Sequence, residues 1–169
     1  MVQAALPFPL YFLGDRGGVF QFRRSVAWYD AAAIVARAAP QVPDAEIVLS
    51  SGAVRVVTDK SNYHYQLAFP LALSRDAVYA VRVAVRVESG GAMVGVEDGE
   101  RWVVPPVRVR TPACVGTYDL GAFTHTGRTP RLIVANGVDQ APDRSTIVLN
   151  SIELWELEPF SFGRVETSR

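Results

Sequence analysis

Cysteine, lysine and histidine are scarce in this chain. Cys114 is the only cysteine among the 169 residues, so neither an internal disulfide nor a cysteine-based metal site can form. A lone thiol slightly favours a reducing compartment, the cytoplasm, although many exported proteins also lack disulfides. Lys60 is the only lysine. The abundance of arginine fits either guanidinium recognition of carboxylate and phosphate groups or the codon bias of a GC-rich genome.

Net charge and long apolar runs are missing as well. The 17 basic residues balance the 17 acidic residues, so the chain has no long-range field to attract nucleic acid or anionic lipid, and we expect neither as a partner. The apolar stretch at residues 4–13 is interrupted by Pro7 and Pro9, and no basic residue precedes it. We therefore expect no signal peptide and no membrane-spanning segment within this chain.

Strand-like alternation dominates the sequence from residue 46 onward. The clearest run is Tyr79–Glu88, in which a tyrosine and four valines occupy the odd positions and small or charged residues the even ones. Side chains alternate between the two faces of a strand, so this run has one buried and one exposed face, as is typical of antiparallel sheets. Eight or nine such runs, separated by turn-forming pairs such as Asp98–Gly99, predict an all-β fold, an antiparallel two-sheet sandwich.

Residues 1–43 have a different pattern. Two short extended runs, Phe8–Leu13 and Val19–Arg24, flank a glycine-rich turn and predict a hairpin. The alanine-rich run Asp30–Pro40 predicts one short helix near the N-terminus, with Asp30 as its cap and Pro40 as its end. We expect an N-terminal arm at 1–43 packed on a sandwich domain at 44–160, followed by a tail at 161–169.

The last strand changes phase halfway along. Ile147 and Leu149 occupy odd positions, whereas Ile152 and Leu154 occupy even positions. A β-bulge near Asn150 would return both pairs to the core face, because the extra residue reverses the alternation.

With this phase change, the last strand resembles the closing strand of galactose-binding-like jelly rolls, a superfamily that includes many carbohydrate-binding modules. The resemblance extends to Tyr63–Phe69, Tyr79–Val87, Met93–Glu97 and Leu132–Gly137 and covers about residues 46–158. It implies a jelly-roll sandwich and a non-catalytic module that binds glycans through aromatic side chains, accessory to a larger protein or pathway. It also implies that a structural calcium ion is possible, since many members hold one.

Catalytic motifs are absent from the sequence. It has no Gly-x-Ser-x-Gly elbow, no phosphate-binding loop and no His-Glu-x-x-His, and its two histidines, His64 and His125, fall in separate segments. We therefore expect a binding module rather than an enzyme. Two alternatives stay open. One is a structural or protein-interaction module without sugar binding, and the other is a small glycosidase- or lyase-like enzyme, which needs only two carboxylates.

Trp102 and Arg101 form the first candidate binding site, at a strand start beside a turn. A tryptophan ring can stack on the C–H face of a sugar while arginine bonds to its hydroxyls. The alternative is that Trp102 packs over an edge of the sandwich. The pair Trp28–Tyr29 is expected to anchor the N-terminal arm on the sandwich, and Trp155 either faces outward or covers that arm.

A polar platform is the second candidate. His64 and Gln66 alternate with Tyr65 and Leu67, and in the next strand Arg82 and Arg86 alternate with valines. If both strands belonged to one sheet, these four polar side chains would line its outer face and suit a hydroxyl- or carboxylate-bearing ligand. An ordinary solvated face gives the same pattern.

No cofactor is expected from a motif. The acidic loop residues with suitable oxygen atoms for calcium are Glu97, Asp98, Asp119, Asp139 and Asp143, and none has an EF-hand spacing. The expected partner is a glycan or another small polar ligand, and a protein partner or a larger parent chain stays open.

Overall fold

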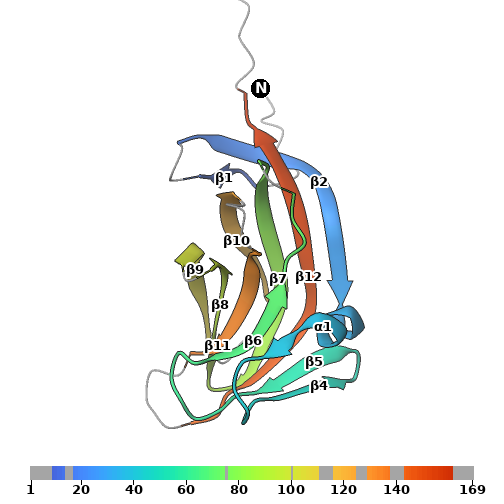
Figure 1. Ribbon diagram of the computed structural model, residues 1–169, viewed down its shortest axis with the longest axis vertical. Coiled ribbons are helices and arrows are strands. Elements are labelled where there is room, and N and C mark those ends of the chain that lie inside the picture. Colours follow the sequence, from blue (N-terminus) through green and yellow to red (C-terminus); the bar gives the residue numbers. More distant parts are fainter. Residues whose placement is uncertain are drawn as a thin grey trace, which may run out of the picture.

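Strands account for most of the structure (Figure 1). The computed structural model describes residues 9–13, 17–74, 76–99, 101–110, 116–124, 129–137 and 143–161. Its strands form two sheets, which we call sheet A and sheet B. The strands of sheet A are β1 (Tyr11–Phe12), β2 (Val19–Asp30), β4 (Glu46–Ser50), β5 (Ala53–Val57), β7 (Val78–Ser89), β10 (Gly116–Thr124) and β12 (Thr146–Pro159). The strands of sheet B are β3 (Ala39–Pro40), β6 (Tyr65–Pro70), β8 (Gly91–Asp98), β9 (Arg101–Arg110) and β11 (Arg131–Asn136).

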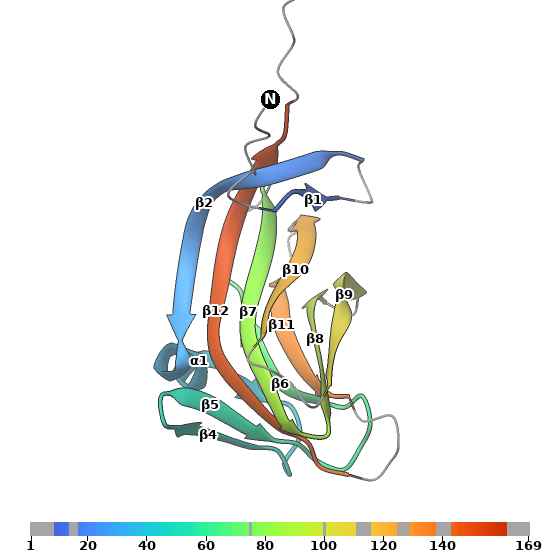
Figure 2. The ribbon, with the colours of Figure 1, turned by 180° about the vertical axis from the view of Figure 1, so that it is seen from behind.

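β12 is the central strand of sheet A. It pairs with β7 along one side and with β2 and β5 along the other, and β10 continues the sheet beyond β7. The order in sheet B is β3-β6-β11-β8-β9. Figures 1 and 2 show the long β7 and β12 side by side, with α1 (Ala31–Arg37) beside the β4–β5 hairpin. The all-β antiparallel sandwich is confirmed. Within the described ranges, no helix is long and apolar enough to cross a membrane.

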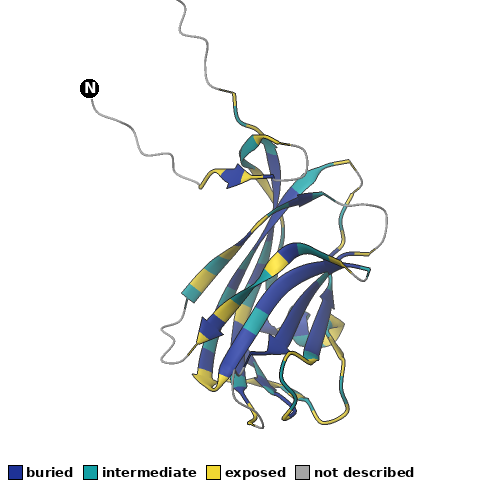
Figure 3. Cartoon of the chain, turned by 90° about the vertical axis from the view of Figure 1, so that its left-hand side faces the viewer, coloured by how far each residue is buried: buried dark blue, intermediate teal, exposed yellow. Residues whose placement is uncertain are grey.

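The main core lies between the two sheets. From β7 it receives Tyr79 and the valines at 81, 83, 85 and 87, which are the odd positions that the alternation predicts. Sheet B contributes Leu67, Phe69, Val94 and Val96 among others. Figure 3 shows buried and exposed residues alternating along several strands, which is the pattern expected when one face of each sheet is covered.

The bulge in β12 is confirmed. The pairing of β12 with β7 shifts register between Leu149 and Ser151. Because of this shift Ile147, Leu149, Ile152 and Leu154 all lie in the core with no exposed surface. One extra residue thus allows a single strand to supply four core side chains across a change of phase.

The N-terminal segment is part of the two sheets. The expected hairpin is present as β1 paired with the start of β2, and Asp30 caps α1 by accepting a hydrogen bond from the Ala33 amide at 2.8 Å. However, β2 pairs with β12 as far as Asp30, and β3 pairs with β6. Residues 19–40 therefore belong to the sandwich, which corrects the expectation of an arm packed on it.

A smaller apolar cluster lies on the outer face of sheet A, the face turned away from sheet B. It contains Trp155, Leu157, Ala80 and Tyr11, all buried. The Phe22 ring meets the Trp155 ring edge to face, with centroids 5.0 Å apart. Trp155 therefore does face outward from its strand, and it is covered by residues of β1 and β2.

Of the pair expected to anchor the N-terminal segment, Tyr29 packs on the core and Trp28 does not. Trp28 lies opposite Glu153 in the β2–β12 ladder, and 62% of its surface is exposed. Its neighbour Tyr29 points the other way and packs against Phe69, with ring centroids 4.9 Å apart. Tyr29 and Ala27 make the contact of β2 with the core, because alternate residues of a strand face the same side.

Candidate functional site

A bulge in β6 determines which aromatic side chain reaches the outer face of sheet B, the face turned away from sheet A. Leu67 pairs with Val134 of β11, but the next pair is Tyr65 with Ala135, so Gln66 is an extra residue. Tyr65 therefore points to the outer face instead of sharing the core face with Leu67. The sequence pattern placed these two residues on the same face, and that interpretation is wrong. The polar Gln66 within an otherwise apolar run was the one available sign.

Tyr65 and Trp102 form an aromatic corner on this face. Their ring centroids are 5.5 Å apart and the ring planes meet at 71°. Trp102 lies opposite Glu97 in the β8–β9 ladder, and its ring occupies the space over Gly95. A Cβ atom added to Gly95 would stand 2.8 Å from Cζ3 of Trp102. The missing side chain at Gly95 thus lets the indole ring lie against the sheet, where both rings remain partly exposed.

A charged pair lies beside the corner. Nη2 of Arg131 donates a hydrogen bond to Oε2 of Glu97 at 2.7 Å, and the Glu97 side chain is only 7% exposed. Burial raises the pKa of the Tyr65 hydroxyl above its ordinary value, and the charge of Glu97 raises this pKa further, while Arg131 partly offsets the increase. The hydroxyl of Tyr65 therefore remains protonated at neutral pH and is able to donate a hydrogen bond.

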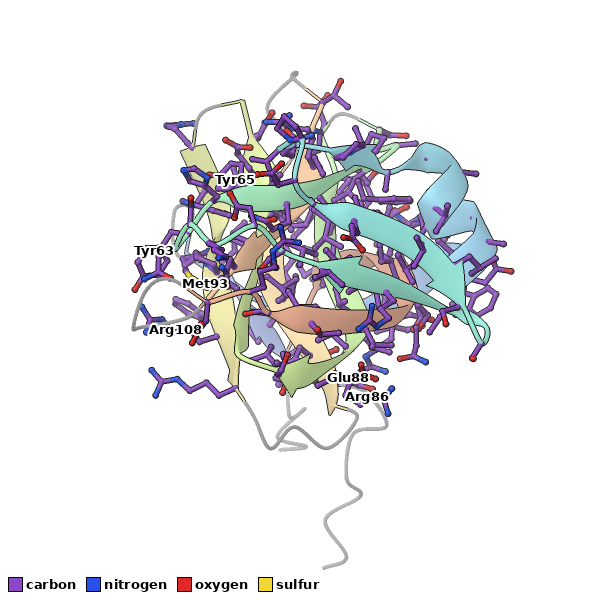
Figure 4. All side chains as sticks on the ribbon, turned by 90° about the horizontal axis from the view of Figure 1, so that it is seen from below. Tyr63, Tyr65, Arg86, Glu88, Met93 and Arg108 are labelled. Carbon is purple, nitrogen blue, oxygen red and sulfur yellow. The ribbon has the colours of Figure 1, made fainter. Side chains whose placement is uncertain are left out.

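Tyr63 and Arg108 extend the same face. Nη2 of Arg108 donates a hydrogen bond to the Tyr63 hydroxyl at 2.9 Å, and Arg108 pairs with Met93 across the β8–β9 ladder. Figure 4 shows Tyr63, Tyr65, Met93 and Arg108 on one side of the molecule. We call the following group the outer-face site: Tyr63, Tyr65, Met93, Glu97, Trp102, Arg108 and Arg131.

His64 and Gln66 take part in a hydrogen-bond network with Asp59. Nε2 of Gln66 donates to one carboxylate oxygen of Asp59 at 2.8 Å, and Nδ1 of His64 lies 3.0 Å from the other. Burial alone would raise the pKa of Asp59, but the hydrogen bonds from His64, Gln66 and the Ser61 amide outweigh it and hold this pKa below its ordinary value. Gln66 has no exposed surface, so it cannot contact a ligand.

The predicted polar platform does not form. Arg82 and Arg86 lie on β7 in sheet A, whereas Gln66 lies on β6 in sheet B. The platform required both strands in one sheet, and the chain instead crosses between the sheets after β6. Nε of Arg82 donates to Asp119 at 2.5 Å, and its guanidinium group lies 4.0 Å from the centroid of the Trp155 ring.

Arg101 and Trp102 are also separated. Arg101 pairs with Asp98 and, as the neighbour of Trp102 in a strand, points to the opposite face of β9. It lines a different hollow of about 300 Å³ that also includes Phe12 and Phe123. Of the predicted ligand-binding residues, Trp102 is the one that lies in the outer-face site.

The acidic candidates among the described residues do not gather into a calcium site. Glu97 is bonded to Arg131, and Asp119 is bonded to Arg82. Asp98 is buried, Asp143 is exposed, and Asp139 lies outside the described residues. In the part of the chain that the structure describes, no group of three or more histidine, cysteine or acidic side chains is placed to hold a metal ion.

Comparison with known proteins supports the fold. No protein-family model matches the sequence, and no curated protein matches it. The carbohydrate-binding module CBM36 in complex with calcium and xylotriose is similar over 76% of this chain and 99% of that chain, with a TM-score of 0.51 and 15% identity. The CBM36-1 domain of a multidomain xylanase from the hindgut metagenome of Trinervitermes trinervoides matches 80% of this chain and 98% of that chain, with a TM-score of 0.52 and 6% identity.

An enzyme also contains a similar domain. The arabinose-bound MgGH51 α-L-arabinofuranosidase matches 88% of this chain but only 27% of that chain, with a TM-score of 0.53 and 14% identity. The chain therefore has the β-sandwich fold of carbohydrate-binding modules, as the closing-strand resemblance implied.

Proposed function

We propose that this protein is a non-catalytic glycan-binding module and that a neutral oligosaccharide binds at the outer-face site. The observation that carries the proposal is the corner formed by Tyr65 and Trp102, two partly exposed rings 5.5 Å apart on a sheet face. Sugar rings present C–H faces that pack on aromatic rings, and two rings at a steep angle contact two sides of one sugar.

Polar groups of the site suit the hydroxyls of such a ligand. The Arg131–Glu97 pair lies beside the corner and offers both a donor and an acceptor, and the protonated Tyr65 hydroxyl adds another donor. A sugar ring seated between an apolar surface and a few fixed polar groups is the usual arrangement of a small-ligand site. We expect the aromatic rings to supply most of the affinity and the polar groups to select the sugar.

The fold comparisons suggest which probe to use first. The CBM36 structure contains xylotriose, so this trisaccharide belongs in a panel of neutral oligosaccharides. The partial match to the MgGH51 arabinofuranosidase supports a role as an accessory unit of a larger protein.

The test is isothermal titration calorimetry of the panel against the wild type and two tryptophan variants. Trp102→Ala is expected to weaken binding about tenfold or more, since losing an aromatic anchor of a binding site typically costs about 2 kcal/mol or more. Trp28→Ala is the matched control, because Trp28 is exposed on the other sheet. Loss of binding in the Trp28 variant but not in the Trp102 variant would place the site elsewhere, and no binding at about 10 mM of any probe would refute the proposal.

A structural or protein-interaction module is the second candidate. Val48 and Leu49 of β4 are about half exposed, and β4 is the last strand in the order of sheet A. An apolar strand at a sheet edge can pair with another chain. Size-exclusion chromatography with light scattering separates the two candidates. Self-association lost in a Leu49→Lys variant would favour the interaction module, whereas a monomer that binds oligosaccharides would not.

A glycosidase-like enzyme is the third candidate function. Such chemistry requires two carboxylates about 5–10 Å apart across the scissile bond. Glu97 is the acidic group beside the aromatic corner, and it is held by Arg131. Chromatography of oligosaccharides incubated with the protein tests this candidate, and we expect no cleavage.

A further inference from the structure

A polar hollow of about 230 Å³ lies on the outer face of sheet A, away from the outer-face site. It is bordered by the β4–β5 hairpin and by β7 and β12. Its polar lining consists of Ser50, Ser51, Arg55, Arg86, Glu88 and Asn150. Figure 4 shows Arg86 and Glu88 apart from the group formed by Tyr63, Tyr65, Met93 and Arg108.

The strand register places one arginine on each side of a valine. Val148 of β12 pairs with Arg55 of β5 on one side and with Arg86 of β7 on the other. Neighbouring strands lie about 4.8 Å apart, so the three side chains form a row across the sheet, with the arginine Cα atoms about 10 Å apart. Val148 is buried, and it forms the floor between two guanidinium groups.

Glu88 holds both arginines without neutralising them. It accepts a hydrogen bond from Nη2 of Arg86 at 2.8 Å, and Nε of Arg55 lies 3.8 Å from its other oxygen. Two positive groups and one negative group leave the cluster with one positive charge. The Nε atom of Arg86 is itself buried and finds no hydrogen-bond partner among the described residues. A buried donor without an acceptor is unfavourable, so contacts within the described part of the chain leave the Arg86 guanidinium group only partly satisfied.

The geometry points to a binding site for an oxyanion, which we infer to be the carboxylate of an acidic sugar or the sulfate group of a sulfated one. Guanidinium groups bind two oxygens of a carboxylate or a sulfate through paired hydrogen bonds, and the Asn150 amide and the hydroxyls of Ser50 and Ser51 offer further donors. The apolar floor at Val148 suits the ring that carries the anionic group. This site lies on a different sheet from the outer-face site, and its existence does not depend on the function proposed above.

Glucuronate and glucose are matched probes because they differ in the carboxylate at C6. Backbone amide shifts of the full chain are followed by two-dimensional NMR during titration with sodium glucuronate, glucose or sodium sulfate at constant ionic strength. We expect glucuronate to shift and saturate the amides of Arg55, Arg86, Val148 and Asn150 at millimolar concentration, and glucose to leave them unchanged. Saturation by sulfate alone supports the oxyanion site and assigns it to sulfate groups. Equal shifts with glucose and glucuronate, or no shift with either anion, overturn it.

Substitutions separate ligand recognition from folding. Arg86→Gln is expected to weaken glucuronate binding at least tenfold, as is typical of losing a hydrogen bond between charged groups. Arg101→Gln removes the same charge at a remote position and should leave binding unchanged. Glu88→Gln should strengthen binding about fivefold, because it removes the carboxylate that competes with the ligand. A merely structural role for Glu88 predicts weaker binding instead, and that result would also overturn the proposal.

Discussion

Asp59 connects several segments through one buried carboxylate and one carbonyl. Its carboxylate accepts hydrogen bonds from Gln66 and from the Ser61 amide, and its carbonyl oxygen accepts one from Nδ2 of Asn136 in β11. Ser145, directly before β12, donates to the Asn136 side chain at 2.8 Å. The end of β5, the start of β6, the end of β11 and the start of β12 therefore share one polar network. Such a network stabilises the fold only while all its members are satisfied.

The Asp59 carboxylate makes stability depend on acid pH. Its pKa is lowered in the folded protein, so the stability that it contributes is complete above the pKa of about 3.9 expected in the unfolded chain and is lost as the pH falls through the lower folded value. We expect Asp59→Asn to lose about 1–3 kcal/mol of unfolding free energy at pH 7, as is typical of hydrogen bonds to a charged group. Urea unfolding at pH 7 and pH 3 measures this difference. It should shrink at pH 3, and an equal difference at both pH values would show that the carboxylate charge has no role.

Gly95 is expected to determine the position of the Trp102 ring in the outer-face site, although a glycine has no side chain with which to contact a ligand. In Gly95→Ala the new Cβ atom would meet the Trp102 ring at 2.8 Å and the Pro106 Cα atom at 2.9 Å, so both the ring and the β9 backbone must move. We expect a stability loss of about 1–3 kcal/mol, typical of overpacking, and a changed Trp fluorescence. Gly121→Ala is the control, since its Cβ atom would meet only Val104, at 3.8 Å. Equal behaviour of the two variants would contradict this account of Gly95.

At the scale of strands, alternation predicted the faces of β7 and failed for β6. Each odd residue of β7 from Tyr79 to Val87 lies in the core, because that strand is regular. The bulge in β12 was predictable since apolar residues appear on both parities around it. In β6 the extra residue is Gln66, and Tyr65 is aromatic, so the sequence resembled uninterrupted alternation. An aromatic residue is equally acceptable on the core face and on a binding face, which is why the outer-face site was only partly predicted.

Deleting Asn150 tests the role of the bulge in β12. Without this residue, strict alternation would turn either the pair Ile147 and Leu149 or the pair Ile152 and Leu154 out of the core, where all four are fully buried. Exposing two such side chains is expected to cost more than about 3 kcal/mol, enough to unfold a marginally stable domain. Asn150→Ala keeps the chain length and should unfold within about 1 kcal/mol of the wild type. Circular dichroism during thermal unfolding compares the two, and a deletion variant as stable as Asn150→Ala would show that the bulge is dispensable.

For the whole molecule, the sandwich separates the two proposed sites. The outer-face site lies on sheet B, and the hollow with Arg55 and Arg86 lies on the outer face of sheet A. Packed sheets lie about 10 Å apart, so the core separates the two ligands. Which sheet each strand joins could not be predicted from local patterns, because β6 and β7 are adjacent in sequence and both alternate. That unknown is why His64, Gln66, Arg82 and Arg86 were grouped on one face.

Sites on opposite faces should bind independently. We expect the Kd of the best neutral oligosaccharide to change less than about twofold in saturating glucuronate. The Kd of glucuronate should change equally little in saturating oligosaccharide. Coupling between two sites requires that binding of one ligand alter the conformation to which the other ligand binds. Salt should distinguish the two sites further. With zero net charge the chain has no long-range field, so only the local charge of the arginine cluster responds when salt is raised. Calorimetry at about 50 and 500 mM NaCl should show weaker glucuronate binding and unchanged neutral-sugar binding. Mutual exclusion of the two ligands would instead mean that they share one site. Because Arg86 and Trp102 lie on different sheets, at least one of the two proposed sites would then be wrong.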